Sequence, residues 1–76
     1  MADERILIDV PALPIPLGAF LKLTGLFETG GAAKIFIQQG RLAVNGVVET
    51  HRRHSLSDGD TVVFAEKAFI VRNSGG

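Results

Sequence analysis

The residues with the most chemical potential in this 76-residue chain lie together at positions 50–57, THRRHSLS. His51, Arg52, Arg53 and His54 are successive hydrogen-bond donors, and each guanidinium group can make planar, bidentate contacts with a phosphate. This run predicts an exposed basic loop. The loop is either an anion-binding site or an ordinary charged surface, and the run alone does not distinguish the two.

The same stretch offers little for metal binding or catalysis. His51 and His54 could hold zinc from one side of a turn, but no third ligand has a matching spacing. The loop contains no acid beside the histidines to orient a ring, and the chain has no cysteine. Asp58 and Asp60 are explained by turn chemistry before a strand. We therefore expect no enzyme, no cofactor and no metal site.

Polar residues on an expected helix form a second candidate surface. Lys34, Gln38 and Arg41 are spaced at i, i+4 and i+7, so they share one face. The Gly30-Gly31 pair weakens that helix but lets a phosphate or another helix approach its backbone. Because Arg41 leads directly into the strands before the basic loop, we expect both polar groups on one surface.

Two short helices position these side chains. The first begins at Pro16 and stops at Gly25, and its apolar stripe leaves Lys22 facing solvent. The second is capped by Thr29 and ended by Gly40. The first helix is too short to be stable alone, so it must pack against other elements.

The remaining patterns predict a sheet around the helices. Strands are expected at 5–10, 42–49 (a hairpin turning at Asn45-Gly46), 61–65 and 68–71. Prolines make 11–16 an extended linker. The order β-α-α-β-β-β predicts an α+β fold, with two short helices packed on a small, mostly antiparallel sheet. We expect a single domain over 1–76 with a flexible tail at 73–76.

The charges are unevenly distributed although their formal sum is zero. Segment 34–54 holds four Lys or Arg residues, both histidines and one acid, Glu49. No apolar run approaches the roughly 20 residues of a membrane span, and the acidic start does not fit a signal peptide. We therefore expect a cytoplasmic protein that has no membrane partner.

A family resemblance covers about residues 17–64. The stretch LGAFLKLTGLFETGGAAKIFIQQGRLAVNGVVE, followed by SLSDGDTV, resembles the alpha-L RNA-binding motif, often called the S-four domain. The landmarks are Leu17, Leu21, Gly25, Thr29, Ala33, Ile37, Gly40, Val44-Asn45-Gly46 and Gly59-Asp60. The Thr-Gly-Gly and Glu-Thr-x-Arg segments look most like the small stand-alone bacterial members.

The resemblance implies RNA binding through the two-helix face and the adjoining strand–loop edge. Structured ribosomal or transfer RNA is the expected partner, a ribosomal particle is a further candidate, and we expect a monomer. The expected RNA-binding residues are Lys22, Thr29, Gly30, Lys34, Gln38, Arg41, His51, Arg52, Arg53 and His54. The chain departs from the family at Pro16, Gly18 and Gly30, where charged residues are common. We therefore expect weaker or more selective binding, with the basic loop partly replacing the lost charges.

A second family shares some of these features. Ubiquitin-like sulfur-carrier proteins also have a Val-Asn-Gly run, an Asp-Gly-Asp turn and a C-terminal Gly-Gly, here Gly75-Gly76. In such a carrier, a partner enzyme would adenylate and thiocarboxylate the terminal glycine. That fold opens with a β-hairpin and has one principal helix, and Asn73-Ser74 lacks its apolar lead-in. RNA binding is therefore the preferred hypothesis, and sulfur carriage is the alternative.

Overall fold

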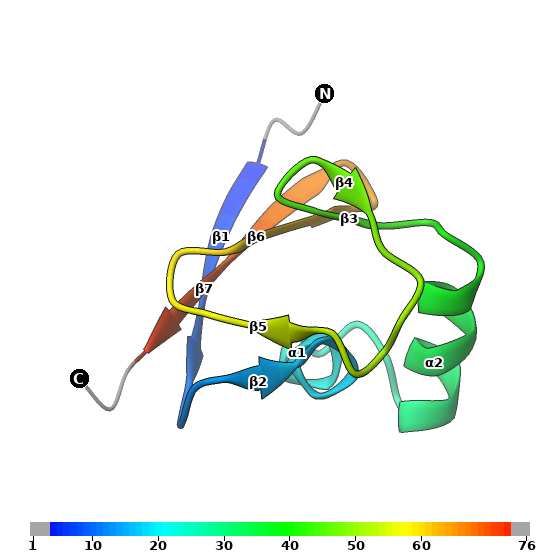
Figure 1. Cartoon of the computed structure of the whole chain (residues 1–76), viewed down its shortest axis with the longest axis horizontal. Coiled ribbons are helices and arrows are strands. Elements are labelled where there is room, and N and C mark those ends of the chain that lie inside the picture. The colour runs from blue at the N-terminus through cyan, green and yellow to red at the C-terminus, as the bar shows by residue number, and fades with distance from the viewer. Residues whose placement is uncertain (1–3, 74–76) are drawn as a thin grey trace.

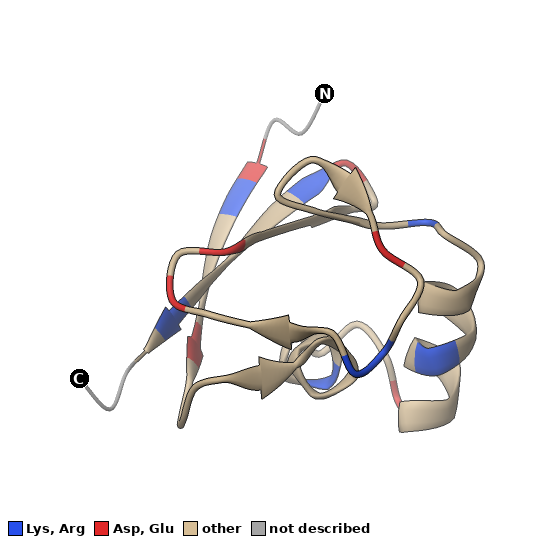
Figure 2. Ribbon diagram, viewed as in Figure 1, with Lys and Arg blue, Asp and Glu red and all other residues tan. Residues whose placement is uncertain are grey.

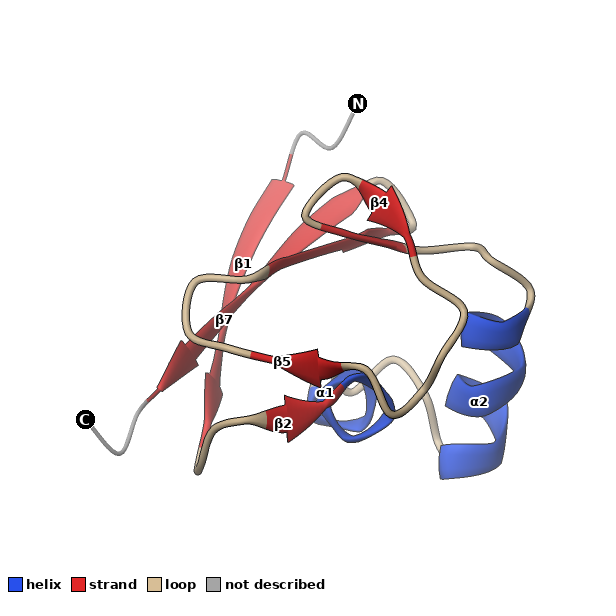
Figure 3. Ribbon diagram, in the orientation of Figure 1, coloured by secondary structure: helices blue, strands red, loops and turns tan. Residues whose placement is uncertain are grey.

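The computed structural model describes residues 4–73, which form two helices, a five-stranded sheet and a two-stranded sheet (Figure 1). The elements are β1 (Glu4–Val10), β2 (Ile15–Pro16), α1 (Leu17–Leu23), α2 (Gly30–Gln38), β3 (Ala43–Val44), β4 (Val47–Val48), β5 (Ser55–Leu56), β6 (Thr61–Phe64) and β7 (Lys67–Asn73). The two helices lie beside each other at one end of the molecule (Figure 3). The predicted α+β class is confirmed.

The larger sheet has the strand order β1-β7-β6-β3-β4. Its first pair, β1 with β7, is parallel, and the other pairs are antiparallel. In the smaller antiparallel sheet, Ile15 of β2 lies opposite Leu56 of β5, and Pro16 lies opposite Ser55. The proline-rich segment is therefore not wholly a linker, because its last two residues form a strand.

The Asn-Gly hairpin and the Asp-Gly-Asp turn are as predicted and are tied together. Asn45 and Gly46 have φ values of 51° and 86°, the positive values that a type I′ turn requires. The Asn45 amide donates to Asp60 Oδ1 at 3.1 Å and accepts from the Thr61 N–H at 3.0 Å. The other Asp60 oxygen accepts from the Ser57 N–H at 2.8 Å. Asp60 therefore stabilises the turn.

The helix boundaries differ from the prediction at two positions. Pro16 is the N-cap of α1 and not its first helical residue, because it is already extended (φ −65°, ψ 144°) in β2. Thr29 caps α2 as predicted, and its Oγ1 accepts from the Ala32 N–H at 3.1 Å. Because α2 ends at Gln38, Arg41 lies beyond the helix and is not part of its polar face.

The core lies between the helices and the inner face of the larger sheet. It consists of Val10, Ile15, Leu17, Phe20, Leu21, Ala33, Ile37, Leu42, Val44, Leu56, Val62, Phe64, Phe69 and Val71. Phe27, Phe36, Phe64 and Phe69 make consecutive ring contacts, with centroids 5.1, 5.5 and 4.6 Å apart. These four aromatic rings are thus engaged with one another.

The end of β7 overlaps the expected tail. Asn73 is the last residue of the strand, and its N–H donates to Asp58 Oδ1 at 3.0 Å. Asn73 therefore belongs to the sheet. The rest of the expected tail, including Gly75-Gly76 of the sulfur-carrier alternative, lies outside the described residues.

Candidate nucleic-acid interface

A groove of about 270 Å³ is formed by α1 and the part of the basic loop before β5, residues 50–54. It is lined by Pro16, Gly18, Ala19, Lys22, Gly30, Arg52 and Arg53. We call this the basic groove. The Lys and Arg positions of α1, α2 and the loop gather at the same end of the molecule (Figure 2). The basic groove therefore combines three cationic side chains with a floor of small residues.

Backbone hydrogen bonds fix the loop against the start of α1. The Leu17 N–H donates to the His54 carbonyl and the Gly18 N–H to the Arg52 carbonyl, both at 2.8 Å. The first amides of a helix have no partner within it, so the loop carbonyls satisfy two of them. This arrangement positions both arginines beside the helix.

The loop packs directly against Gly18, at a distance that would put an added Cβ in ordinary van der Waals contact. A Cβ at this position would lie 3.4 Å from the Arg52 carbonyl oxygen and 3.5 Å from Arg52 Cβ. From the sequence, Gly18 was expected only as a lost charge, and Pro16 as a lost charge at the start of the first helix. In the structure both line the basic groove. The contact joins positions far apart in the sequence, so no local signal could have revealed it.

Glu49 organises the inside of the loop. Its Oε2 accepts from the backbone N–H groups of Thr50 and His51, at 3.1 and 3.0 Å, and lies 3.0 Å from His51 Nδ1. Its Oε1 lies 3.1 Å from His54 Nδ1. The expectation that no acid orients the histidines is therefore wrong. The acid was missed because it precedes the loop and reaches both rings only when the loop closes.

The same contacts shift the titration of the carboxyl group. The His51 backbone N–H, followed by the His51 side chain, lowers the pKa of Glu49 below its ordinary value near 4.5. The Glu49 side chain is 17 % exposed, whereas that of His51 is 84 % exposed. Glu49 is therefore an internal anchor, and the arginines remain at the loop surface.

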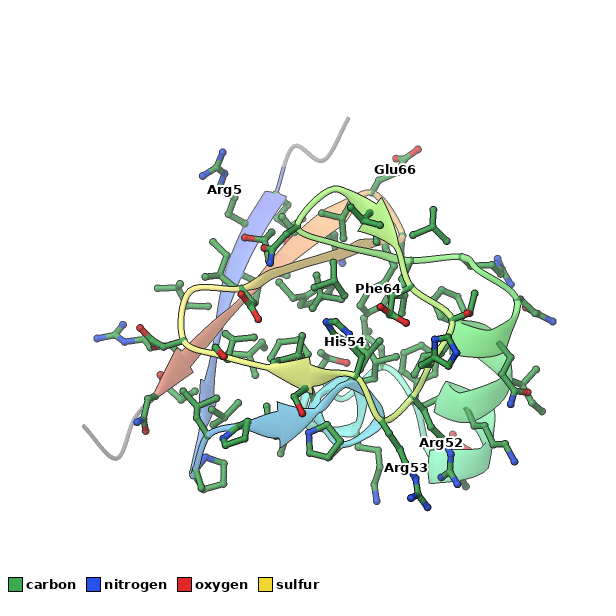
Figure 4. The ribbon with its side chains drawn as sticks, in the orientation of Figure 1. Arg5, Arg52, Arg53, His54, Phe64 and Glu66 are labelled. Atoms are coloured by element: carbon green, nitrogen blue, oxygen red, sulfur yellow. The ribbon has the colours of Figure 1, made fainter. Side chains whose placement is uncertain are left out.

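Arg52 and Arg53 are the exposed part of the loop. Neither makes an ion pair or a side-chain hydrogen bond among the described residues, and both extend from the loop on the side of the molecule that holds the helices (Figure 4). No described acid lines the basic groove. The two guanidinium groups are thus available to an anionic partner without competition from a neighbouring carboxylate.

A second, more open depression continues the surface toward α2. It has a volume of about 230 Å³ and is lined by Gln38, Thr50, His51, Arg52 and Arg53. Because the two arginines line both depressions, the surface is continuous from α1 across the loop to the end of α2. The expected convergence of the helix and loop groups therefore occurs for Gln38 and the basic loop.

Other predicted site residues lie apart from these depressions. Lys34 is exposed on α2 but lines neither depression, and the Thr29 hydroxyl is engaged as the helix cap. His54 is partly buried and turned toward Glu49. The Arg41 guanidinium lies 4.9 Å from the Phe36 ring centroid. Arg41 is thus directed toward that ring.

The described residues contain no group of three or more His, Cys, Asp or Glu side chains arranged to hold a metal ion. Within residues 4–73 there is also no helix long and apolar enough to cross a membrane. The basic groove is therefore the main candidate site: no described acid lines it, and its charged side chains are Lys22, Arg52 and Arg53. Fold and groove together define a small α+β domain with a positively charged surface groove.

The comparisons with known proteins identify the family. The model of the S4 domain family matches residues 8–72, so the chain belongs to this family. It is 45% identical over 51 residues to "Putative RNA-binding protein YbcJ" of Escherichia coli (strain K12), covering 67% of this chain and 73% of that protein. It is 36% identical over 55 residues to "Probable ribosome maturation protein RlbA" of Bacillus subtilis (strain 168), covering 72% of this chain and 78% of that protein. The sulfur-carrier alternative finds no support in these matches.

Proposed function

We propose that the protein is a non-catalytic RNA-binding module that holds structured RNA in the basic groove. The observation that carries this proposal is the convergence of Lys22, Arg52 and Arg53 on a groove that no described acid lines. Two arginines held side by side suit the closely spaced phosphates of an RNA backbone. Membership of the S4 domain family and the name of the Escherichia coli relative support RNA as the anion.

Binding is electrostatic and depends on the shape of the RNA. Arg52 and Arg53 contact phosphates, and Lys22 contacts them from the opposite wall of the groove. Gly30 offers room beside Lys22, because the nearest atom to an added Cβ would be Lys22 Cδ at 3.8 Å. Lys34, Gln38 and His51 extend the contact along α2 and the second depression.

Stacking with unpaired bases contributes little. The ring contacts among Phe27, Phe36, Phe64 and Phe69 keep these side chains within the fold. Single-stranded RNA is usually bound by exposed aromatic platforms, whereas structured RNA is recognised by its shape and phosphates. A folded ribosomal or transfer RNA is therefore the proposed partner. Ribosomal RNA is preferred, because one relative carries a name that refers to ribosome maturation.

The proposal is tested by crosslinking RNA to the protein in growing cells and sequencing the bound fragments. Fragments from structured regions of ribosomal or transfer RNA are expected from the wild-type chain, in the cytoplasm. The Arg52→Ala/Arg53→Ala variant should lose most of these crosslinks. If the variant is crosslinked as efficiently as the wild type, the basic groove is not the RNA-binding site.

A further inference from the structure

The edge of the sheet formed by β1 is a second surface, distinct from the basic groove. β1 pairs with β7 along all seven of its residues, and its opposite side pairs with no strand among residues 4–73. Its centre, Ile6-Leu7-Ile8, is a β-forming apolar run, and Leu7 is 56% exposed. Edge strands usually carry charges, prolines or bulges that prevent pairing with another chain. The centre of β1 has none of these.

The two faces of β1 have different environments. Ile6 and Ile8 are partly buried against the hydrophobic core. Arg5, Leu7 and Asp9 alternate with them, so they project from the opposite face and are exposed. A strand added at this edge would therefore meet apolar side chains on the core face. On the outer face it would meet one apolar side chain, Leu7, and two charged ones, Arg5 and Asp9.

The order of these residues is self-complementary about Leu7. If a second β1 is laid antiparallel with Leu7 opposite Leu7, then Arg5 lies opposite Asp9 and Ile6 lies opposite Ile8. The two residues of each pair are an even number of positions apart in the sequence. Their side chains therefore lie on the same face of the sheet, and their backbone N–H and C=O groups point toward the same edge of the strand. Within residues 5–9 the resulting cross-strand pairs are opposite charges and matched apolar residues, which stabilise antiparallel strands, and only the end pair, Glu4 with Val10, is not matched.

We propose that the protein self-associates through antiparallel pairing of β1 with β1 of a second copy, joining the two five-stranded sheets into one. Charge complementarity selects the second copy as the occupant, because both Arg5–Asp9 contacts form only in this register. Asp9 forms an ion pair with Arg72 at 3.7 Å, but both side chains are 62% exposed, so Asp9 can also reach Arg5 of a second copy. The pairing is two-fold symmetric and therefore closes at a dimer.

The dimer leaves the RNA-binding surface open. Arg5 lies at the opposite side of the molecule from Arg52 and Arg53 (Figure 4). Each dimer therefore presents two basic grooves. Pairing of one short strand buries less than the roughly 1,200 Å² of a standard stable interface, so the association is weak and concentration-dependent.

Sedimentation equilibrium of the full chain tests the proposal. At a concentration of about 1 mM, where weak complexes populate, the average mass of the wild type should rise well above the 8.1 kDa of one chain. Arg5→Glu places a carboxylate opposite Asp9, and Asp9→Arg places a guanidinium group opposite Arg5. Each variant should associate about tenfold or more weakly. Glu28→Arg, an exposed charge reversal away from this edge, should associate like the wild type.

Mixing the two charge variants separates edge pairing from a general effect of charge. In a mixed pair, the introduced carboxylate of one variant meets the introduced guanidinium group of the other, and the unchanged Asp9 meets the unchanged Arg5. An equimolar mixture should therefore regain wild-type association. Leu7→Lys, which places two ammonium groups together at the centre, should abolish it. A wild-type chain that stays monomeric at about 1 mM overturns the proposal. A mixture that remains monomeric, or single variants that still dimerise, does the same.

Discussion

Replacing Arg52 and Arg53 with alanine is the sharpest test of how the basic groove binds RNA. Both side chains are exposed and make no described ion pair, so their removal should leave the thermal midpoint of unfolding unchanged. The backbone carbonyl of Arg52, which accepts from the Gly18 N–H at 2.8 Å, is retained in the variant. The perturbation therefore removes two phosphate contacts and little else.

The magnitude follows from the number of phosphates contacted. Lys22, Arg52, Arg53 and Lys34 provide about four contacts, so the wild-type slope of log affinity against log salt should be roughly −3 to −4. Each phosphate contact contributes about 0.7 to 0.9 to the magnitude of this slope, so the slope of the double variant should be shallower by about 1.4 to 1.8. At about 0.1 M salt, one decade below the 1 M reference, its affinity should fall roughly 25- to 60-fold.

Fluorescence anisotropy of a labelled RNA hairpin, titrated between about 50 and 200 mM salt, measures both quantities. The matched control is Lys67→Ala/Arg72→Ala, which also removes two positive charges but on β7, outside the groove. The control should keep the wild-type slope. If the Arg52→Ala/Arg53→Ala variant also keeps it, the phosphates are bound elsewhere. If both variants lose affinity equally, net charge and not the groove governs binding.

Three further predictions follow from the site and its supports. Gly30→Arg places a cation beside the basic groove and should steepen the salt slope by about 0.7 to 0.9, whereas Gly31→Arg, outside the groove, should change it less. Thr29→Ala removes the cap of α2 and should lower the free energy of unfolding by about 1 kcal/mol in urea titrations, with Thr29→Ser close to wild type. Because the folded-state pKa of Glu49 is lowered, mainly by the His51 N–H, its carboxylate stabilises the fold above the ordinary value near 4.5. That stability is lost as the pH falls through the folded-state pKa. Glu49→Gln should therefore flatten the decline of the melting temperature in this acidic range. If the melting temperature of the variant falls with pH as in the wild type, Glu49 does not have this stabilising role.

Features with a local chemical cause could be predicted from the sequence. The cap at Thr29, the type I′ turn at Asn45-Gly46 and the Asp60 turn each depend on residues within a few positions of one another. The apolar spacing of α1 likewise predicted its buried face, since Leu17 and Phe20 are both fully buried. These signals are short-range, so the sequence alone contained them.

Features created by chain closure could not be predicted in the same way. The β2–β5 pair and the parallel β1–β7 pair join segments that are far apart in the sequence, and neither pairing has a local signature. The role of Glu49 depends on the loop folding back so that one carboxylate reaches His51 and His54. Arg41 was placed on the wrong face because α2 ends at Gln38. Each difference arises where tertiary contacts, and not propensity, fix the position of a side chain.

The glycine at position 18 and the arginines of the loop are best understood as one unit. The sequence comparison alone suggests that a charge was lost from the helix and that an unrelated loop compensates for it. In the structure, the Gly18 N–H donates to the Arg52 carbonyl, so the start of α1 fixes the loop that carries both arginines. The backbone of α1 therefore positions a loop whose two arginines line the basic groove together with Lys22, within a chain of zero formal net charge.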